Sequence, residues 1–278
     1  MKNKIQLILL LILLSTKLVN AQEENNKKIQ MGISLGSSLN FNKVDTKLIE
    51  ELNPAYDLSI GMNIIKNFNE NLGFNTGVEF DFSSMKYKFN NIVYYHYSDN
   101  EILNKNDKND NEAYKIFVIE ERQEKPIYLT IPTMLLFKTD YIGYNRYFAK
   151  FGMRHSFCLK NTTNDKGELD NTDIEMSQNN SVQKTFERMK LQQDLSIYTG
   201  TVGVSAGTEW NYSGSSSIQF ELGYYYGINN LHRGDALIGD KQKNMTLFES
   251  TEVKTSNIQY TTVKSSRNQL ALKITFLF

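Results

Sequence analysis

The chain has 278 residues, with 31 basic side chains, 31 acidic side chains and one cysteine, Cys158. A balanced charge offers no electrostatic footprint for nucleic acid, and a single cysteine cannot form an internal disulfide. Sixteen tyrosines and 16 phenylalanines against three prolines favour strands over disorder.

The N-terminus has the pattern of an export signal. The basic start MKNK is followed by the apolar run 5–14, and Val19 and Ala21 fit a small-residue cleavage rule. That run is too short to span a bilayer as a helix, so we predict a signal peptide over residues 1–21, with a membrane-anchor helix as the alternative. Three lysines leave with it, which gives the mature chain, 22–278, a net charge of 28 − 31 = −3.

Eight segments of the mature chain alternate between apolar and polar residues, which is typical of strands with one apolar face. In the first, Met31, Ile33 and Leu35 share one face, and glycine and serine share the other. Each segment reaches the length of about 9–11 residues that a membrane-spanning strand needs. The segments are 30–41, 55–65, 72–82, 127–137, 147–159, 198–210, 217–228 and 268–278.

The connections between these segments alternate between short and long. Three are short turns rich in Gly, Asn and Ser, at 66–71, 138–145 and 211–216. The other four are long and cover about 43–54, 84–125, 160–195 and 230–267. An even number of strands with short turns at one end and long loops at the other is the layout of an outer-membrane barrel.

A soluble barrel or sandwich is the alternative, because it also alternates, with its polar face toward water. The polar face of 30–41 is small and uncharged, whereas the apolar faces are rich in Phe and Tyr, which favours contact with lipid. We therefore predict an all-β fold: an eight-stranded antiparallel transmembrane β-barrel with short periplasmic turns and long extracellular loops. In loop 84–125, the runs NIVYYHYS and YKIFVIEE are expected to extend a hairpin above the membrane.

Charged residues fall on the face predicted to line the lumen. An eight-stranded barrel is just wide enough for side chains to fill, so a nearly balanced set predicts a network of ion pairs that plugs it. Arg154 is expected to bind Glu79, Glu209 or Glu221 in a bidentate manner. The predicted network comprises Asp57, Glu79, Asp81, Lys138, Lys150, Arg154, Glu209, Glu221 and Lys273.

A selective pore is the alternative interpretation of this lumen, but channels that hold water need about 16–18 strands. Catalysis is poorly supported, because His96 and His232 lie in predicted loops beside many Ser and Asp residues, and His155 lies on the lipid-facing side of its strand. Many different Ser–His–Asp combinations could be chosen from such loops, so the sequence defines no catalytic triad. We expect no enzyme activity, no cofactor and no metal site.

Three segments resemble PorT-type outer-membrane β-barrels. They are YLTIPTMLLFK (128–138), GVSAGTEW (203–210) and ELGYYYGINNL (221–231). The resemblance implies location in a Gram-negative outer membrane, and the family's namesake is an accessory of type IX secretion and gliding machinery. It also implies that the terminal aromatics Phe276 and Phe278 are the signal that the barrel assembly machinery reads.

The expected function is that of a structural or surface-interaction barrel whose long loops present a binding surface. A secretion accessory like the namesake is the alternative, and small-solute transport or membrane-embedded catalysis rank behind both. The expected partners are outer-membrane lipid, the assembly machinery, and either a surface ligand or secretion proteins, with no nucleic acid.

Overall fold

The computed structural model describes residues 29–44, 49–98, 101–103, 115–170, 181–189, 195–213, 216–232, 248–249, 259–260 and 265–278. The predicted signal peptide and most of 230–267 lie outside the described residues. Within the described part of the chain, no helix is long and apolar enough to cross a membrane.

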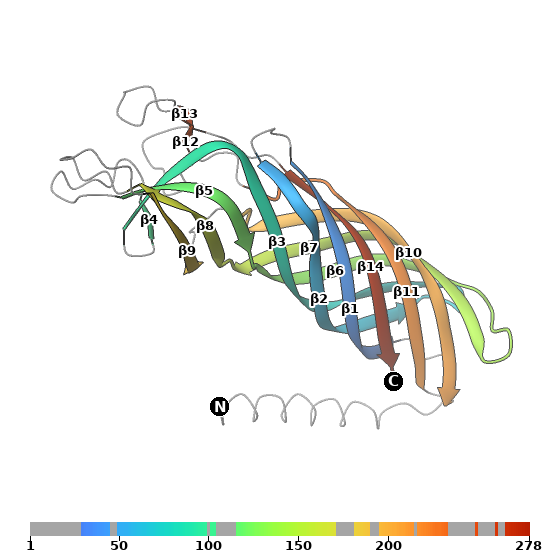
Figure 1. Cartoon of the computed structure of the whole chain (residues 1–278). Helices are drawn as coiled ribbons and strands as arrows, with labels where there is room; N and C mark the ends of the chain where they lie inside the picture. The colour runs from blue at the N-terminus through green and yellow to red at the C-terminus, as the bar shows by residue number, and fades with distance from the viewer. Residues whose placement is uncertain are drawn as a thin grey trace, which may run out of the picture.

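Eight antiparallel strands close into a barrel, as predicted (Figure 1). Around the wall their order is β1, β14, β11, β10, β7, β6, β3 and β2. The pairing of β2 with β1 closes the ring. Their bounds are β1 (Ile29–Val44), β2 (Ile49–Asn67), β3 (Leu72–Ser98), β6 (Ile127–Lys138), β7 (Asn145–Lys160), β10 (Tyr198–Ser213), β11 (Ser216–Gly227) and β14 (Ser265–Leu277).

The exposed and buried faces of the wall are the reverse of those of a soluble barrel. Outward residues such as Leu58, Phe80 and Leu272 are exposed, by 53%, 42% and 61%, whereas charged inward residues such as Glu79 are buried. A wall that is apolar outside and polar inside is stable only where its outside meets lipid. The alternation predicted from the sequence therefore has the predicted orientation.

One proline lies within the barrel wall. Pro132 of β6 is paired with Arg154 of β7, but the ladder between β6 and β3 is interrupted where Ile131 and Pro132 pass Gly77 and Val78. Proline has no N–H to donate, so it is tolerated where the ladder is open. The interruption accounts for a proline in a strand that has neighbours on both sides.

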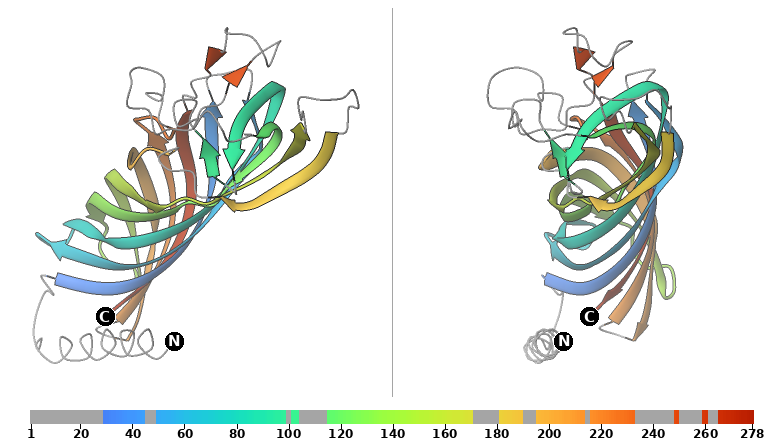
Figure 2. Two further views of the ribbon diagram at one scale, coloured as in Figure 1. Left: turned by 90° about the vertical axis from the view of Figure 1, so that its left-hand side faces the viewer. Right: turned by 60° about the vertical axis from the view of Figure 1, so that its left-hand side comes forward.

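The barrel continues at one end into a projecting sheet, which we call the extension (Figure 2). Its strands run in the order β3, β5, β8, β9. The sequence predicts long loops at 84–125 and 160–195, and the structure instead has strands in parts of both. The bounds are β4 (Glu101–Leu103), β5 (Lys115–Glu124), β8 (Thr163–Asp170), β9 (Ser181–Met189), β12 (Phe248–Glu249) and β13 (Gln259–Tyr260).

The extension forms because barrel strands continue past short breaks. β5 and β6 both pair with β3 and are separated by Lys125 and Pro126. In the same way β7 is followed, after two residues, by β8, which pairs with β5. The expected extension of the hairpin above the barrel is confirmed, since β3 runs unbroken to Ser98 and pairs with β5.

Candidate functional site

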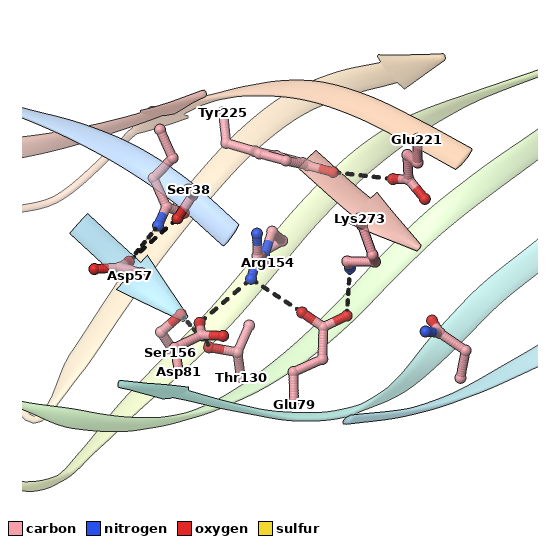
Figure 3. Close-up of polar contacts among 12 residues, drawn as sticks. Ser38, Asp57, Glu79, Asp81, Thr130, Arg154, Ser156, Glu221, Tyr225 and Lys273 are labelled. Carbon is pink, nitrogen blue, oxygen red and sulfur yellow. Dashed lines mark hydrogen bonds and ion pairs between the residues drawn. The ribbon is translucent and has the colours of Figure 1, made fainter. Parts of the chain in front are cut away.

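The centre of the lumen holds a carboxylate between two bases. Glu79 of β3 accepts a hydrogen bond from Lys273 of β14 and another, at 3.0 Å, from Nη2 of Arg154 of β7 (Figure 3). The same Nη2 lies 3.3 Å from Oδ2 of Asp81. All four side chains are buried, and a buried charge is tolerated when it is paired and hydrogen-bonded.

Asp81 is held by more than Arg154. The hydroxyl of Thr130 in β6 donates to Asp81 at 2.7 Å and lies 2.8 Å from the hydroxyl of Ser156 in β7 (Figure 3). This chain of contacts joins β3, β6 and β7 in one polar layer. It fixes the carboxylate where the guanidinium of Arg154 can reach it.

A second base–acid pair lies beside this layer. Nζ of Lys150 in β7 is 2.6 Å from Glu221 of β11, and the hydroxyl of Tyr225 lies 3.5 Å from the same carboxylate. The ring of Tyr225 lies 5.1 Å beneath the guanidinium carbon of Arg154. A cation over an aromatic face is stabilised in a site with little water, so Tyr225 connects the two ion-pair groups.

Two glycines give the aromatic rings of the lumen their space. A Cβ added to Gly203 would lie 2.6 Å from Cδ1 of Tyr225, and one added to Gly207 would lie 2.7 Å from Cζ of Phe148. Both rings therefore lie against bare backbone of β10. The space that side chains would take at these two positions is filled by aromatic rings.

Two arginines that the sequence analysis missed complete the network. Arg267 pairs with Asp57 at the end toward the extension, and its guanidinium carbon lies 4.8 Å from the ring centroid of Tyr128. Arg146 pairs with Glu209 at 2.6 Å at the opposite end. Each arginine lies one residue before a predicted strand, on the inward face, so extending each predicted strand by one residue would have revealed them.

The structure brings together eight of the nine predicted network residues in ion pairs. Arg154 binds Glu79, as expected, but Asp81 is its second partner, because Glu221 and Glu209 are held by Lys150 and Arg146. Lys138, the ninth, hydrogen-bonds Asn67 Oδ1 at 2.9 Å and Gln30 Oε1 at 3.4 Å. The predicted bidentate contact is therefore replaced by one nitrogen shared between two carboxylates.

Apolar side chains close the lumen at the short-turn end. Ile65, Leu136, Phe148 and Leu277, from four strands, form a buried cluster there. Tyr141, in the turn between β6 and β7, donates to Glu209 at 3.1 Å. These four side chains pack against one another inside the barrel at this level.

A separate core lies where the extension meets the barrel. Met85, Tyr87 and Ile119 are buried there, as is the pair of Arg122 with Asp165, at 2.6 Å. The sequence predicts a loop over 160–195, yet Asp165 is buried in β8 and joins that strand to β5 through Arg122. The described residues hold no group of three or more metal-ligating side chains.

The three histidines differ from one another. His155 faces outward, with Nδ1 2.9 Å from the hydroxyl of Tyr198, and His96 belongs to β3 rather than to a loop. His232, expected in a loop, is buried against Ser265 and Glu124. Neither of these partners could be chosen from the sequence, because they are 33 and 108 positions away along the chain.

Comparison with known proteins identifies the barrel. The model of the "Outer membrane protein beta-barrel domain" family matches residues 20–233, well over half of the chain. No match is found among curated proteins.

Several solved outer-membrane proteins are similar to the chain at low identity. Neisserial surface protein A is 10% identical, with 91% of this chain and 98% of that chain covered and a TM-score of 0.34. Ail of Yersinia pestis is 11% identical, with coverages of 90% and 98% and a TM-score of 0.32. OprG of Pseudomonas aeruginosa is 9% identical, with coverages of 90% and 94% and a TM-score of 0.32.

The family match, rather than these distant likenesses, supports the assignment, and it agrees with a closed barrel whose exposed face is apolar. The chain belongs to the outer membrane protein beta-barrel domain family and is located in the outer membrane.

Proposed function

We propose that this protein is a surface-interaction barrel: the wall anchors it, the ion-pair network fills the lumen, and the extension is its binding surface. In this arrangement the short turns face the periplasm and the extension faces the outside of the cell. Lipid is the partner of the wall, the assembly machinery is the partner during insertion, and nucleic acid is not a partner.

The observation that supports this proposal is the free edge of the extension. Along the described strands, the sheet ends at β9, which pairs with β8 through seven residue pairs. An edge strand presents unpaired backbone donors and acceptors and is a template for an added strand. Its sequence, SVQKTFERM, contains no proline that would block such pairing.

Site-specific photo-crosslinking on whole cells tests the proposal. A photoreactive residue at Thr185 of β9 is expected to give a discrete protein adduct, and one at Leu222, which faces lipid, is expected to give none. Successive N–H groups of a strand point to opposite sides, so one of the two single variants Val182→Pro and Gln183→Pro removes a donor from the free edge and should abolish the adduct. A barrel that folds, is exposed on the surface and gives no β9-dependent adduct would contradict the proposal.

A secretion accessory, as the resemblance to PorT-type barrels implies, is the second candidate. The observation that favours it lies in the turn between β6 and β7, where Ile142 is 70% exposed and Tyr144 is 75% exposed. Large apolar side chains at a turn that faces water are typical of a protein contact. They would meet a periplasmic partner.

Deletion of the gene, followed by comparison of the secreted and surface-shaved proteomes with those of the parent, separates the two functions. Loss of a whole class of secreted cargo, reproduced by Ile142→Ser with Tyr144→Ser, would identify a secretion accessory. An unchanged proteome would leave the surface-interaction role.

A further inference from the structure

His232 lies where four segments of the chain meet. It follows β11, and its backbone forms a bridge with Leu195, just before β10. The neighbouring Leu231 donates its N–H to the carbonyl of Ser265 at 2.8 Å and accepts from the N–H of Ser196 at 2.8 Å. The backbone around His232 is therefore held between the beginnings of β10 and β14.

The imidazole joins the extension to the barrel. Its Nδ1 lies 2.6 Å from Oγ of Ser265, the first residue of β14. Its Nε2 lies 3.5 Å from Oε2 of Glu124, the last residue of β5. The ring of Tyr87, on β3, meets it edge-on at 5.5 Å. One side chain thus contacts a strand of the extension and the strand that closes the barrel.

The order serine, histidine, carboxylate is also that of a hydrolase relay. Here the three side chains are only 3%, 6% and 1% exposed, respectively, the ring of Tyr87 meets the imidazole, and the neighbouring Leu195 and Leu231 are buried too. A nucleophile needs a reacting carbonyl group beside it, and this packing leaves the hydroxyl of Ser265 facing the imidazole. The geometry is that of a structural contact that links β5 of the extension to β14 of the barrel.

The strength of this contact depends on the protonation of the imidazole. A neutral imidazole has one N–H, so it can donate to Glu124 only if Nδ1 accepts the proton of the Ser265 hydroxyl. A protonated imidazole donates from both nitrogens and adds a positive charge beside the carboxylate. Hydrogen bonds between charged groups are shorter and about twice as strong as neutral ones.

Among the residues that the structure describes, the other ionisable groups of this region leave that contact in place. Tyr87 offers its ring edge, and Arg267, two residues beyond Ser265, is held by Asp57. Arg122, two residues before Glu124, is held by Asp165. Tyr128 and Cys158 lie within electrostatic range of both Glu124 and Arg267. The Tyr128 hydroxyl and the Cys158 thiol are both neutral in the pH range where a histidine titrates.

We propose that His232 is a proton-operated clasp: protonation tightens the junction between the extension and the barrel, and loss of the proton loosens it. Histidine changes charge between about pH 5 and pH 8, so the clasp would respond to mild acid at the cell surface. The inference goes beyond the surface-binding role, because it concerns the junction and holds whatever the extension binds.

Hydrogen exchange of the refolded full-length protein in lipid nanodiscs tests the clasp without any ligand. After correction for intrinsic exchange rates, the β5 amides should gain about fivefold protection between about pH 8 and about pH 6, whereas those of β6 and β7 should not change. His232→Gln keeps a donor and an acceptor but does not titrate, and should remove this gain. His155→Gln replaces the histidine that faces outward and should retain the gain of protection.

Two results would overturn the proposal: no gain in the unaltered protein, or a gain that survives in His232→Gln. If His232→Gln does not refold, Glu124→Gln replaces it, because it removes the carboxylate that lies 3.5 Å from Nε2 of the imidazole. A full gain of protection in Glu124→Gln would overturn the proposal equally.

Discussion

Lys273 donates a hydrogen bond to Glu79 across the lumen, although their strands, β14 and β3, are separated in the wall by β1 and β2. Arg154 reaches the same carboxylate from the other side, across β6. Through Glu79 the network therefore joins strands that share no backbone hydrogen bonds. Its members hold the cross-section of the barrel, whereas the ladders hold its wall.

Removing Arg154 should destabilise the barrel. Arg154→Ala leaves Asp81 without its ion pair and Glu79 with Lys273 alone, and breaking a buried pair costs about 3–5 kcal/mol. We expect a lower urea midpoint for unfolding from lipid vesicles, followed by tryptophan fluorescence. Lys66→Ala, at an exposed position of β2, is the control and should leave the midpoint near that of the parent. An unchanged midpoint in Arg154→Ala would contradict the network.

The purified barrel should not conduct ions. Phe148, Leu136, Ile65 and Leu277 form a buried apolar cluster inside the barrel, and an eight-stranded barrel has room for little beyond its own side chains. Planar-bilayer recording should therefore show no stable single-channel current. Regular current steps from protein that migrates as a folded barrel on gels would favour the pore.

A side chain at Gly203 should hinder folding. A Cβ there would meet the carbonyl oxygen of Tyr224 at 2.2 Å and the Tyr225 ring at 2.6 Å, and overpacking of this kind costs about 1–3 kcal/mol. We expect Gly203→Ala to lower the folded fraction in heat-modifiable gel migration. Ala206→Val adds volume on the exposed face of the same strand and should fold normally. Equal folding of both variants would show that both the β11 backbone at Tyr224 and the Tyr225 ring can shift to make room.

Glu51 should make the β1–β2 hairpin sensitive to pH at its extension end, beyond the apolar band. Burial raises the pKa of its carboxyl from 4.5 to about 7. Hydrogen bonds from the backbone N–H and the side chain of Asn42 lower this pKa and offset part of the effect of burial. A raised carboxyl pKa means that the folded state holds the proton more tightly than the unfolded state. The stability that this provides is complete below about pH 4.5 and is lost as the pH rises toward about 7.

Carbon-13 NMR of the Glu51 side-chain carboxyl would measure this titration directly. Glu51→Gln should remove that residue's share of the change in unfolding midpoint between about pH 5 and pH 8. A titration midpoint near that of a free glutamate would contradict the predicted shift.

The barrel was predictable from the sequence because its wall obeys a simple rule. Residues two apart along a strand share a face, so the inward positions of Asp57, Lys150 and Glu221 could be predicted by parity alone. Arg146 and Arg267 were missed by one residue each, since the apolar alternation stops before the strand does. Strand ends are the least reliable part of such a prediction.

The partners within the lumen could not be predicted in the same way. Parity says that Arg154 and Glu79 both face inward, but the stagger of the closed sheet decides which inward residues share a level. That stagger brings Asp81 rather than Glu209 to Arg154. The contacts of His232 are equally distant along the chain, and β8 has a polar sequence, TNDKGELD, without the apolar alternation that predicts a strand.

The position of Lys273 and Arg267 on the last strand has a consequence for partly built barrels. Both of these bases come from β14, and they pair with Glu79 and Asp57, which lie on β3 and β2. A barrel that lacked β14 would keep an uncompensated carboxylate at Asp57 and a half-compensated one at Glu79. Such an intermediate cannot exclude water from its lumen, because each uncompensated charge costs several kcal/mol away from water. The carboxylates of β2 and β3 therefore obtain all of their counter-charges only when the last strand, β14, joins the barrel.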